Sequence, residues 1–304
     1  MKVSSPDRVI FPGAGLTKAD VVQHYEAVGD RMLAFLADRP LTLQRFPRGI
    51  AAKGFMQKNA AKHFPETIAR YPVAKRDGTM TQYPVVHKSE DIAYLANQGT
   101  ITFHMWTSTV TRPNHPDWLV LDLDPEEADT QGVRFAAQAA AVVLDEFGLN
   151  GMLLATGSKG FHIWVPLDGA VGFEHVSLAT RALAGIIASR HSDKLTTEFL
   201  KKDRAGRVFV DWLRNTSIAT VVVPFSLRPR PGAPMAVPLR WDELPTARPG
   251  QWSLTDHRDR LDVPTELPTC TLEYDMIMAA AETAGVDLHT PHDRFGRKRK
   301  PDSP

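Results

Sequence analysis

The sequence predicts an α/β fold of the α+β kind, built as a single module. Short apolar segments that read as strands, such as residues 118–124, alternate along the chain with longer segments of helical spacing, such as residues 173–190. The 304 residues contain no internal repeat and no linker long enough to separate two independent domains. We therefore expect one domain over residues 1–290, followed by a basic, disordered tail over residues 291–304.

The composition is ordinary for a globular protein. Hydrophobic residues make up 43% of the chain and charged residues 23%, and the net charge of +1 neither demands nor excludes a nucleic-acid partner. The single cysteine, Cys270, excludes an internal disulfide framework and a cysteine-rich zinc site, and it favours a reducing, cytoplasmic location. No apolar run approaches the roughly 20 residues that span a bilayer, so we expect no membrane contact.

The N-terminal segment predicts a short extended piece, a Pro/Gly turn and then a helix. Thr17 is a good N-cap with Asp20 at the third helical position, and apolar residues follow helical spacing up to Leu36. Arg8 and Lys18 flank the turn. Two such cations most often belong to a solvated surface, and this interpretation remains open.

Residues 41–64 predict a strand over residues 41–45 that continues into a basic loop. The cations are Arg45, Arg48, Lys53, Lys58 and Lys62, and they are interleaved with Phe46, Phe55 and Phe64. Cations neutralise phosphates and rings stack on bases, so the pattern is typical of binding to single-stranded or template nucleic acid. Core aromatics beside exposed lysines would look similar, and both interpretations stay open.

Residues 72–111 predict short strands, a turn and a helix before the most informative segment. The turn is at Asp77-Gly78, the helix covers residues 91–97, and the strand TITFHMW covers residues 100–106. This strand places His104 among apolar neighbours, where a lone histidine is usually structural. It deserves interest because the strand leads directly towards a pair of aspartates.

The two aspartates stand two residues apart in HPDWLVLDLDP, residues 115–125. Because side chains on a strand alternate faces, Asp122 and Asp124 point the same way. Adjacent carboxylates repel unless a cation lies between them, and oxygen-only ligands suit Mg²⁺ or Mn²⁺. Pro125 ends the strand, which leaves the pair at its C-terminal lip. A pair of solvated turn aspartates is the alternative.

A phosphate-binding turn is predicted one helix later. The segment contains a helix over residues 132–147, a strand over residues 151–154, the turn TGSKG over residues 156–160 and the strand HIWVPL over residues 162–167. Small residues in the turn allow backbone N–H groups to converge on an anion, with Lys159 as a point charge, although the spacing is not that of a P-loop. His162 and Trp164 point the same way, so His162 could reach the same anion.

A third aspartate follows a cluster of cations. After the helix predicted over residues 173–190, the segment KKDRAGRVFVDWLRN brings Lys201, Lys202, Arg204 and Arg207 before a strand that ends in Asp211. These cations could bind polyphosphate or a DNA backbone. Asp211 could complete a metal cluster with the first two aspartates, or it could merely pair with Arg214.

The C-terminal part predicts a last core strand, TVVVPF, then a Pro-rich loop and a short helix over residues 272–284. Arg228 and Arg230 stand in a rigid L-R-P-R-P context that suits phosphate better than lysine would. The RKRK run of the tail would add nonspecific DNA affinity or simply solubility.

Four of these segments together resemble a known family. HPDWLVLDLDP, TGSKGFHIWVPL, RVFVDWLRN and PFSLRPRPGAP, in this order, look like the polymerase domain of bacterial ligase D, in the archaeo-eukaryotic primase superfamily. SPDRVIFPGAGLTKAD and RPLTLQRFPRGI extend the resemblance over residues 4–290. It implies one primase-polymerase module whose central, mostly antiparallel catalytic sheet, an RRM-like primase core, is flanked by helices and a second, smaller sheet.

The resemblance also implies roles for individual residues. Asp122, Asp124 and Asp211 would hold two divalent metal ions, with Mn²⁺ preferred over Mg²⁺. The nucleotide ligands would be Ser158, Lys159, Gly160, His162, Arg204, Arg228 and Arg230 around the triphosphate of an NTP or dNTP, with His104 near the incoming nucleotide. Arg8 and Lys18 would take the 5′-phosphate of a DNA gap or break. Arg45, Phe55 and Lys58 would contact the DNA, with Phe55 stacked on the templating base.

The implied function is template-directed nucleotidyl transfer that fills gaps and extends ends during non-homologous end joining. DNA with gaps or double-strand breaks, Ku and a separate DNA ligase would be the partners, and the protein would act in the cytoplasm, at the nucleoid. Two alternatives stay open. A DNA primase that starts chains without a primer would share the same metal and triphosphate sites. A noncatalytic module that binds DNA 5′-phosphate ends is disfavoured, because a pure binder has no need of three carboxylates facing a polyanion.

Overall fold

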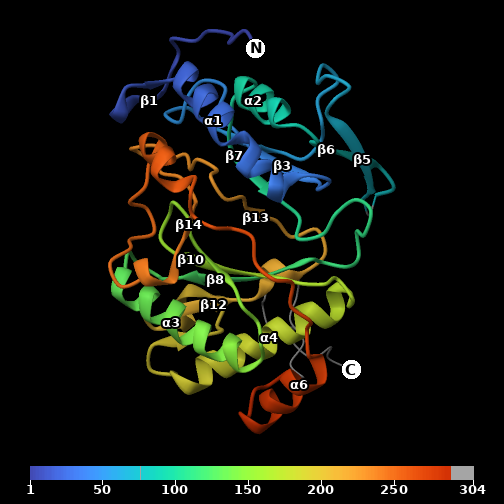
Figure 1. Cartoon of the computed structure of the whole chain (residues 1–304), viewed down its shortest axis with the longest axis vertical. Helices are drawn as coiled ribbons and strands as arrows, with labels where there is room; N and C mark the ends of the chain where they lie inside the picture. Colours follow the sequence, from blue (N-terminus) through green and yellow to red (C-terminus); the bar gives the residue numbers. More distant parts are fainter. Residues whose placement is uncertain (76, 289–304) are drawn as a thin grey trace.

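Two β-sheets form the centre of the computed structural model, which describes residues 1–75 and 77–288 (Figure 1). The larger sheet has six strands, in the order β11 Leu195–Thr196, β12 Val208–Asp211, β8 Trp118–Asp124, β10 Phe161–Pro166, β9 Met152–Ala155 and β14 Val237–Leu239. All neighbours are antiparallel except β11 and β12, which are parallel. The aspartate-bearing strand β8 therefore lies inside the sheet, between β12 and β10.

The smaller sheet has four antiparallel strands, in the order β13 Val221–Val222, β7 Thr100–Met105, β3 Leu41–Arg45 and β4 Phe55–Gln57. Two hairpins belong to neither sheet, β1 Val9–Phe11 with β2 Leu16–Thr17 and β5 Ala69–Ala74 with β6 Met80–Val85. The expected mixed module, with a mostly antiparallel central sheet and a second smaller sheet, is confirmed.

Helices cover the outer sides of the two sheets (Figure 1). The smaller sheet is covered by α1 Lys18–Leu36 and α2 Ser89–Asn97. The larger sheet is covered by α3 Thr130–Glu146 and α4 Phe173–Arg190, and α6 Tyr274–Thr283 packs against α4. The short helical segments are α5 Lys201–Arg204, η1 Pro12–Ala14, η2 Leu213–Asn215, η3 Trp241–Glu243 and η4 Leu254–Arg260. No described helix is long and apolar enough to cross a membrane.

Burial on both faces explains the apolar runs of the central strands. Every residue of β9, β10 and β12 is buried, because α3 and α4 cover one face of the larger sheet and the smaller sheet faces the other (Figure 1). A polar side chain placed on such a strand needs a partner or a ligand. His162 on β10 and Asp211 on β12 are the polar side chains in this position that matter for the site.

Local signals set the helix ends as the sequence predicts. The Thr17 hydroxyl accepts from the Asp20 backbone N–H at 3.3 Å, and the Asp20 carboxylate accepts from the Thr17 N–H at 2.7 Å. Helix α4 covers the predicted residues, and α3 begins and ends within two residues of expectation. The turn at Asp77-Gly78 is also confirmed, with a φ of +79° at Gly78.

The C-terminal strands differ from the prediction. The apolar run TVVVPF forms only the two-residue strand β13, which joins the smaller sheet beside β7. Residues 237–239, expected in a Pro-rich loop, form β14, where Pro238 is tolerated because β14 is the edge strand. The expected tail over residues 291–304 lies outside the described residues.

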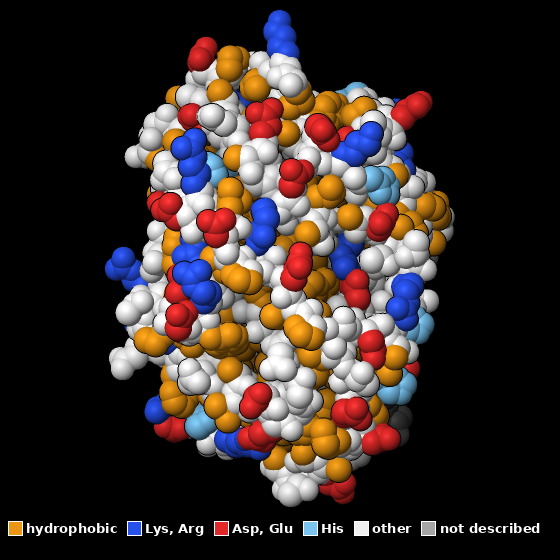
Figure 2. Space-filling view, viewed as in Figure 1, with side chains coloured by type: hydrophobic (Ala, Val, Ile, Leu, Met, Phe, Trp, Pro, Cys, Tyr) orange, Lys and Arg blue, Asp and Glu red, His pale blue; other side chains and the backbone are white. Residues whose placement is uncertain are grey.

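Charges of both signs are interspersed on the face shown in Figure 2. Lys and Arg side chains lie among Asp and Glu side chains there, in keeping with the net charge of +1. An interface for nucleic acid must therefore come from local groups of cations rather than from a uniformly basic face on this side.

Candidate active site

A cavity of about 310 Å³ lies where the two sheets face each other, at the end of β8. Eight residues predicted from the sequence line it, namely His104, Asp122, Asp124, Ser158, Lys159, Gly160, His162 and Arg228. The other lining residues are Met56, Thr156, Arg214, Thr220, Val221 and Val222. The fold thus brings together groups from β7, β8, β10 and the segment after β13 that lie far apart in the chain.

Two of the three predicted aspartates, Asp122 and Asp124, line this cavity, and Asp211 lies beside Asp122 without lining it. Asp122 on β8 and Asp211 on β12 are register partners. Arg214 lies between them, with Nε 3.0 Å from Asp122 Oδ2 and Nη2 3.4 Å from Asp211 Oδ2. Asp124 is more exposed and pairs with Arg204 at 3.2 Å. The alternative pairing of Asp211 with Arg214 is therefore present, but Asp122 shares the same guanidinium.

The surroundings move the pKa values of Asp122 and Asp211 in opposite directions. Burial raises the pKa of Asp122, but the charges of His162 and Arg214 outweigh burial and hold this pKa well below its usual range. Burial raises the pKa of Asp211 to about 6; Arg214 opposes this shift, and the charges of Asp122 and Asp124 reinforce it. The charged form of Asp211 is therefore the one that its surroundings disfavour, and a further cation beside it would stabilise that charge.

The donor set suits a divalent metal ion. Carboxylate oxygens are the hard ligands that Mg²⁺ and Mn²⁺ prefer. As the side chains stand, no three acidic, histidine or cysteine residues of the described chain converge on one ion position, since Arg214 and Arg204 occupy the carboxylates. The Arg214 side chain is 42% exposed, so it has room to move towards solvent and to leave Asp122 and Asp211 to an ion.

The turn between β9 and β10 approaches the aspartate strand closely. Thr156 closes it by donating from N and Oγ1 to the Gly160 carbonyl oxygen at 3.1 and 2.8 Å. A Cβ on Gly157, whose φ is +66°, would lie 2.6 Å from the Met235 carbonyl carbon, and a Cβ on Gly160 would lie 2.1 Å from the Leu123 carbonyl oxygen. Only glycine permits both approaches, which place the turn at the cavity wall.

Lys159 and His162 lie on either side of the aspartate strand end. Lys159 Nζ donates to the Glu126 carbonyl oxygen at 3.3 Å, just beyond β8. His162 is the register partner of Asp122, and its Nε2 lies 3.3 Å from Asp122 Oδ1. Trp164 Nε1 lies 3.4 Å from His162 Nδ1, so the other ring nitrogen, Nε2, is the one that faces Asp122. His162 thus contacts Asp122 here, and its contact with a bound anion stays a prediction.

Two half-buried side chains of the cavity each keep a buried nitrogen without a partner among the described residues. These nitrogens are Nδ1 of His104 and Nε of Arg228. Burial and the charges of Arg228 and Arg214 lower the pKa of His104 to about 3, so its ring is neutral at physiological pH. Arg228 Nη1 donates to the Thr156 carbonyl oxygen at 3.3 Å. Buried polar atoms without a partner are costly, so both nitrogens indicate a place for ligand groups.

Two of the predicted nucleotide ligands do not line the cavity. Arg230 is exposed. Arg204 is only 4% exposed; its guanidinium binds Asp124 and two backbone carbonyls and packs over the Phe209 ring at 4.3 Å. In this structure Arg204 is the counter-ion of Asp124 rather than a free phosphate ligand.

Arg214 lines the cavity, although the sequence predicts for it only an ion pair with Asp211. It follows Asp211 by three residues on η2, which brings it within reach of Asp122 as well. Asn215 fixes η2 to β8, since its side chain accepts from the Val120 N–H and donates to the Val120 carbonyl oxygen, both at 2.7 Å. An arginine and an asparagine three and four residues after a strand-terminal aspartate were the signal that could have found it.

Arg8 and Lys18 lie side by side at the β1–β2 hairpin. The Lys18 N–H donates to the Arg8 carbonyl oxygen at 2.8 Å, and the pKa of Lys18 is lowered by burial and by the charge of Arg8. Their side chains donate to neutral oxygens, Lys18 Nζ to Ser4 Oγ at 2.6 Å and Arg8 Nη1 to the Pro47 carbonyl oxygen at 2.6 Å. Two adjacent cations that are bonded only to neutral oxygens would be stabilised by a bound anion.

Strand β4 presents exposed apolar side chains beside the cavity. Phe55 is 49% exposed, and Met56, which is 50% exposed, lines the cavity. The Arg45 guanidinium lies 5.5 Å from the centre of the Phe55 ring and donates from Nε to the Gln98 carbonyl oxygen at 3.0 Å. Lys58 is exposed one residue beyond the strand. An exposed ring beside cations is the combination that single-stranded nucleic acid requires.

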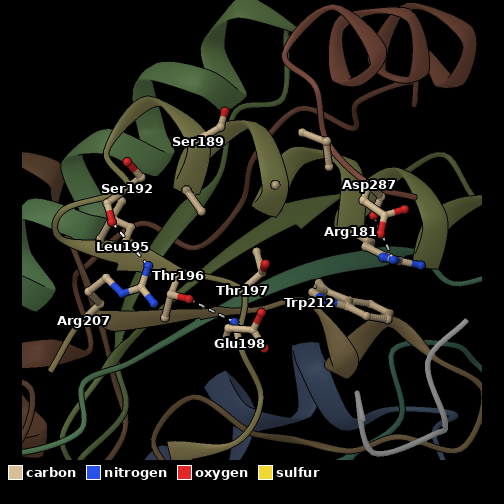
Figure 3. A pocket seen from close by; sticks show the side chains of 13 residues that line it. Arg181, Ser189, Ser192, Leu195, Thr196, Thr197, Glu198, Arg207, Trp212 and Asp287 are labelled. Carbon is tan, nitrogen blue, oxygen red and sulfur yellow. Dashed lines mark hydrogen bonds between the residues drawn. The ribbon is translucent and has the colours of Figure 1, made fainter. Parts of the chain in front are cut away.

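A second cavity, of about 330 Å³, lies against α4 (Figure 3). Of the candidate residues named from the sequence, Arg207 lines it, and the aspartates and the glycine turn do not. Charged side chains of its wall are held by backbone groups of the same wall: Arg181 donates to the Asp287 carbonyl oxygen at 2.9 Å and Arg207 to the Ser192 carbonyl oxygen at 3.3 Å. The chemistry is therefore assigned to the cavity between the sheets.

The chain is similar to several known proteins. The chain is 32% identical over 266 residues to the multifunctional non-homologous end joining protein LigD of Mycolicibacterium smegmatis, covering 86% of this chain and 35% of that protein. It is 31% identical over 264 residues to the protein of the same name from Pseudomonas aeruginosa, covering 86% of this chain and 31% of that protein. The chain thus spans about a third of the length of these relatives.

The structure is similar to that of the polymerase domain from Mycobacterium tuberculosis ligase D in complex with DNA. The TM-score is 0.79 at 29% sequence identity, and the match covers 87% of this chain and 99% of that one. The family model "LigD, primase-polymerase domain" matches residues 17–269. The chain therefore belongs to the LigD primase-polymerase domain family, whose members are polymerases of the nucleotidyltransferase type.

Proposed function

We propose that this chain is a template-directed nucleotidyltransferase that adds ribonucleotides or deoxyribonucleotides to a primer 3′-OH at gaps and ends, during double-strand break repair by non-homologous end joining. The observation that carries the proposal is the cavity that joins a carboxylate cluster to Lys159, Arg228 and a neutral His104. Phosphoryl transfer needs carboxylates that hold metal ions together with cations that bind phosphate, because the protein mainly positions the reacting groups and neutralises their charge. The names of the relatives support end joining, and the DNA of the structural neighbour supports a DNA partner.

Polymerase chemistry requires a divalent metal ion and a nucleotide. We infer that Asp122, Asp124 and Asp211 hold two divalent ions, Mn²⁺ in preference to Mg²⁺, which when bound would lower the pKa of the primer hydroxyl and neutralise the triphosphate. His162 orients Asp122 through its Nε2 atom. Arg214 keeps the carboxylates of Asp122 and Asp211 side by side before an ion arrives.

The nucleotide would lie against the glycine turn and Arg228. Ser158 and Gly160 offer polar backbone at the cavity wall and Lys159 adds a point charge. The unpartnered Nε of Arg228 is a donor for a phosphate oxygen, and Arg230 would extend the positive field from the exposed side. His104 is neutral, so its free Nδ1 can bond to the incoming nucleotide without adding charge.

The DNA would be held at two places. Arg8 and Lys18 would bind the 5′-phosphate beyond a gap, and Phe55 would stack on the templating base with Arg45 and Lys58 near the backbone. Ku and a separate DNA ligase would complete the repair, with the protein acting in the cytoplasm at the nucleoid.

Lys18→Ala is expected to weaken binding to a 5′-phosphorylated gapped duplex about tenfold, because a charge-assisted bond to phosphate is lost. Binding to the same duplex without the phosphate should change little. Fluorescence anisotropy at one fixed salt concentration measures both affinities. Lys88→Ala, which removes an exposed lysine away from this pair, is the control. Equal losses on the two duplexes would contradict 5′-phosphate recognition.

Primer extension tests the proposed function directly. The protein is incubated with a gapped, 5′-phosphorylated duplex, Mn²⁺ and NTPs, and templated additions at the primer end are expected. Absence of extension with Mn²⁺, Mg²⁺ and both nucleotide types would refute a polymerase. Dinucleotide synthesis on an unprimed strand, without extension of the primer, would favour a primase instead.

A further inference from the structure

The segment that carries Arg228 leaves the smaller sheet in an unusual way. The ladder between β13 and β7 pairs Val222 with His104, and a last backbone bond runs from the Val223 N–H to the Phe103 carbonyl oxygen at 3.1 Å. The chain then turns at Phe225, whose φ of +66° is rare for a residue other than glycine. Beyond this turn, side chains replace the backbone bonds to β7, while the backbone pairs with residues 234–236 on its other side.

Three hydroxyl groups take over the contacts between this segment and β7. Ser226 Oγ accepts from the Phe103 N–H at 2.8 Å, and Thr102 Oγ1 donates to the Leu227 carbonyl oxygen at 2.7 Å. Tyr25, from α1, makes the third contact: its hydroxyl donates to the Ile101 carbonyl oxygen and accepts from the Leu227 N–H at 2.9 Å. Leu227 is therefore held through both of its backbone polar groups.

Tyr25 is a fixed support because water cannot compete with it. The side chain is fully buried and packs edge-on against the Phe103 ring at 5.0 Å. Burial also raises the pKa of Tyr25 well above its usual range, so the hydroxyl stays a neutral donor and acceptor. Replacing the ring by phenylalanine would leave the Leu227 N–H and the Ile101 carbonyl without this partner.

Arg228, the next residue, depends on its backbone for its position. Its side chain makes one described hydrogen bond, from Nη1 to the Thr156 carbonyl oxygen at 3.3 Å, and its Nε has no partner among the described residues. Its own N–H is bonded to the Pro234 carbonyl oxygen at 2.7 Å. A shift of Leu227 would therefore move the guanidinium relative to the cavity, because few side-chain contacts resist it.

We propose that Tyr25 is a positioning residue of the nucleotide site, acting through Leu227 on Arg228. Tyr25 lies on α1, on the outer side of the smaller sheet, and its hydroxyl thus sets the position of the Arg228 guanidinium in the cavity. This inference rests on the proposed function, since it takes Arg228 to bind the triphosphate. Tyr25 itself does not line the cavity and needs no contact with the nucleotide.

Tyr25→Phe is expected to raise the KM for ATP in primer extension with Mn²⁺ about tenfold, while kcat at saturating ATP and the affinity for gapped DNA stay within about twofold. The matched control is Tyr94→Phe, which removes a hydroxyl bonded at 3.3 Å to the His63 carbonyl oxygen on the surface. A thermal melt of each variant shows that the fold is retained. An unchanged KM in a folded Tyr25→Phe variant would overturn the inference.

A double-mutant cycle separates positioning from a general loss of packing. If Tyr25 acts through Arg228, Tyr25→Phe raises the KM of the wild-type protein but has no further effect in the Arg228→Ala background. Equal effects in both backgrounds would refute the inference. Titration of the metal-loaded wild-type protein with ATP identifies which claim fails: no ATP binding refutes the proposed function together with this inference, whereas normal ATP binding with equal affinity in Tyr25→Phe refutes this inference alone.

Discussion

Replacing Asp122 by asparagine is expected to lower the rate of primer extension by at least about a thousandfold, because the proposed metal site loses its central charge. Asp122 is the register partner of both Asp211 and His162, and it shares Arg214 with Asp211. Asparagine has the same shape, so the strand stays in place and only the charge is removed. Steady-state extension of a gapped duplex and Mn²⁺ titration measure the two consequences.

The control for Asp122 is Asp145→Asn, which removes an exposed carboxylate from α3. This control should leave extension and Mn²⁺ binding unchanged, and both variants should bind gapped DNA as the wild type does. Extension that survives in Asp122→Asn would remove Asp122 from the metal site. A loss of DNA binding in parallel with activity would instead make Asp122 a structural residue.

The aspartates show how far local sequence rules reach. Side chains on a strand alternate, so Asp122 and Asp124 could be placed on one face from their spacing alone. That Asp211 is the register partner of Asp122 depends on the pairing of β12 with β8, which no local pattern contains. The same holds for His162, whose partner is Asp122 because β10 pairs with the other edge of β8.

The arginines show where such rules stop. Arg204 and Arg228 both belong to segments that predict phosphate binding. Arg228 lines the cavity, whereas Arg204 turns into the protein and pairs with Asp124. Sequence gives the charge of an arginine and not the direction of its long side chain. The strand TVVVPF is a similar case, since an apolar run indicates a strand but not the sheet that accepts it.

Gly160→Ala is expected to destabilise the protein by about 3 kcal/mol and to weaken ATP binding about a hundredfold, because the added methyl group meets backbone that cannot move aside. The new Cβ would lie 2.1 Å from the Leu123 carbonyl oxygen on β8. Either the turn or the end of β8 must shift, and this shift separates Lys159 from the carboxylates of Asp122 and Asp124. Chemical denaturation and titration with ATP in the presence of Mn²⁺ measure the two effects.

Gly13→Ala is the matched control, since a Cβ there meets nothing within 4 Å and the backbone needs no positive φ. It should leave both stability and ATP affinity close to those of the wild type. If Gly160→Ala were destabilised yet bound ATP normally, the turn would be a structural connection without a role in the nucleotide site. If it were unaffected in both respects, β8 and the turn would have to lie further apart than the structure places them. The hundredfold loss is expected only if the short distance between the turn and β8 is what places Lys159 beside the proposed metal site.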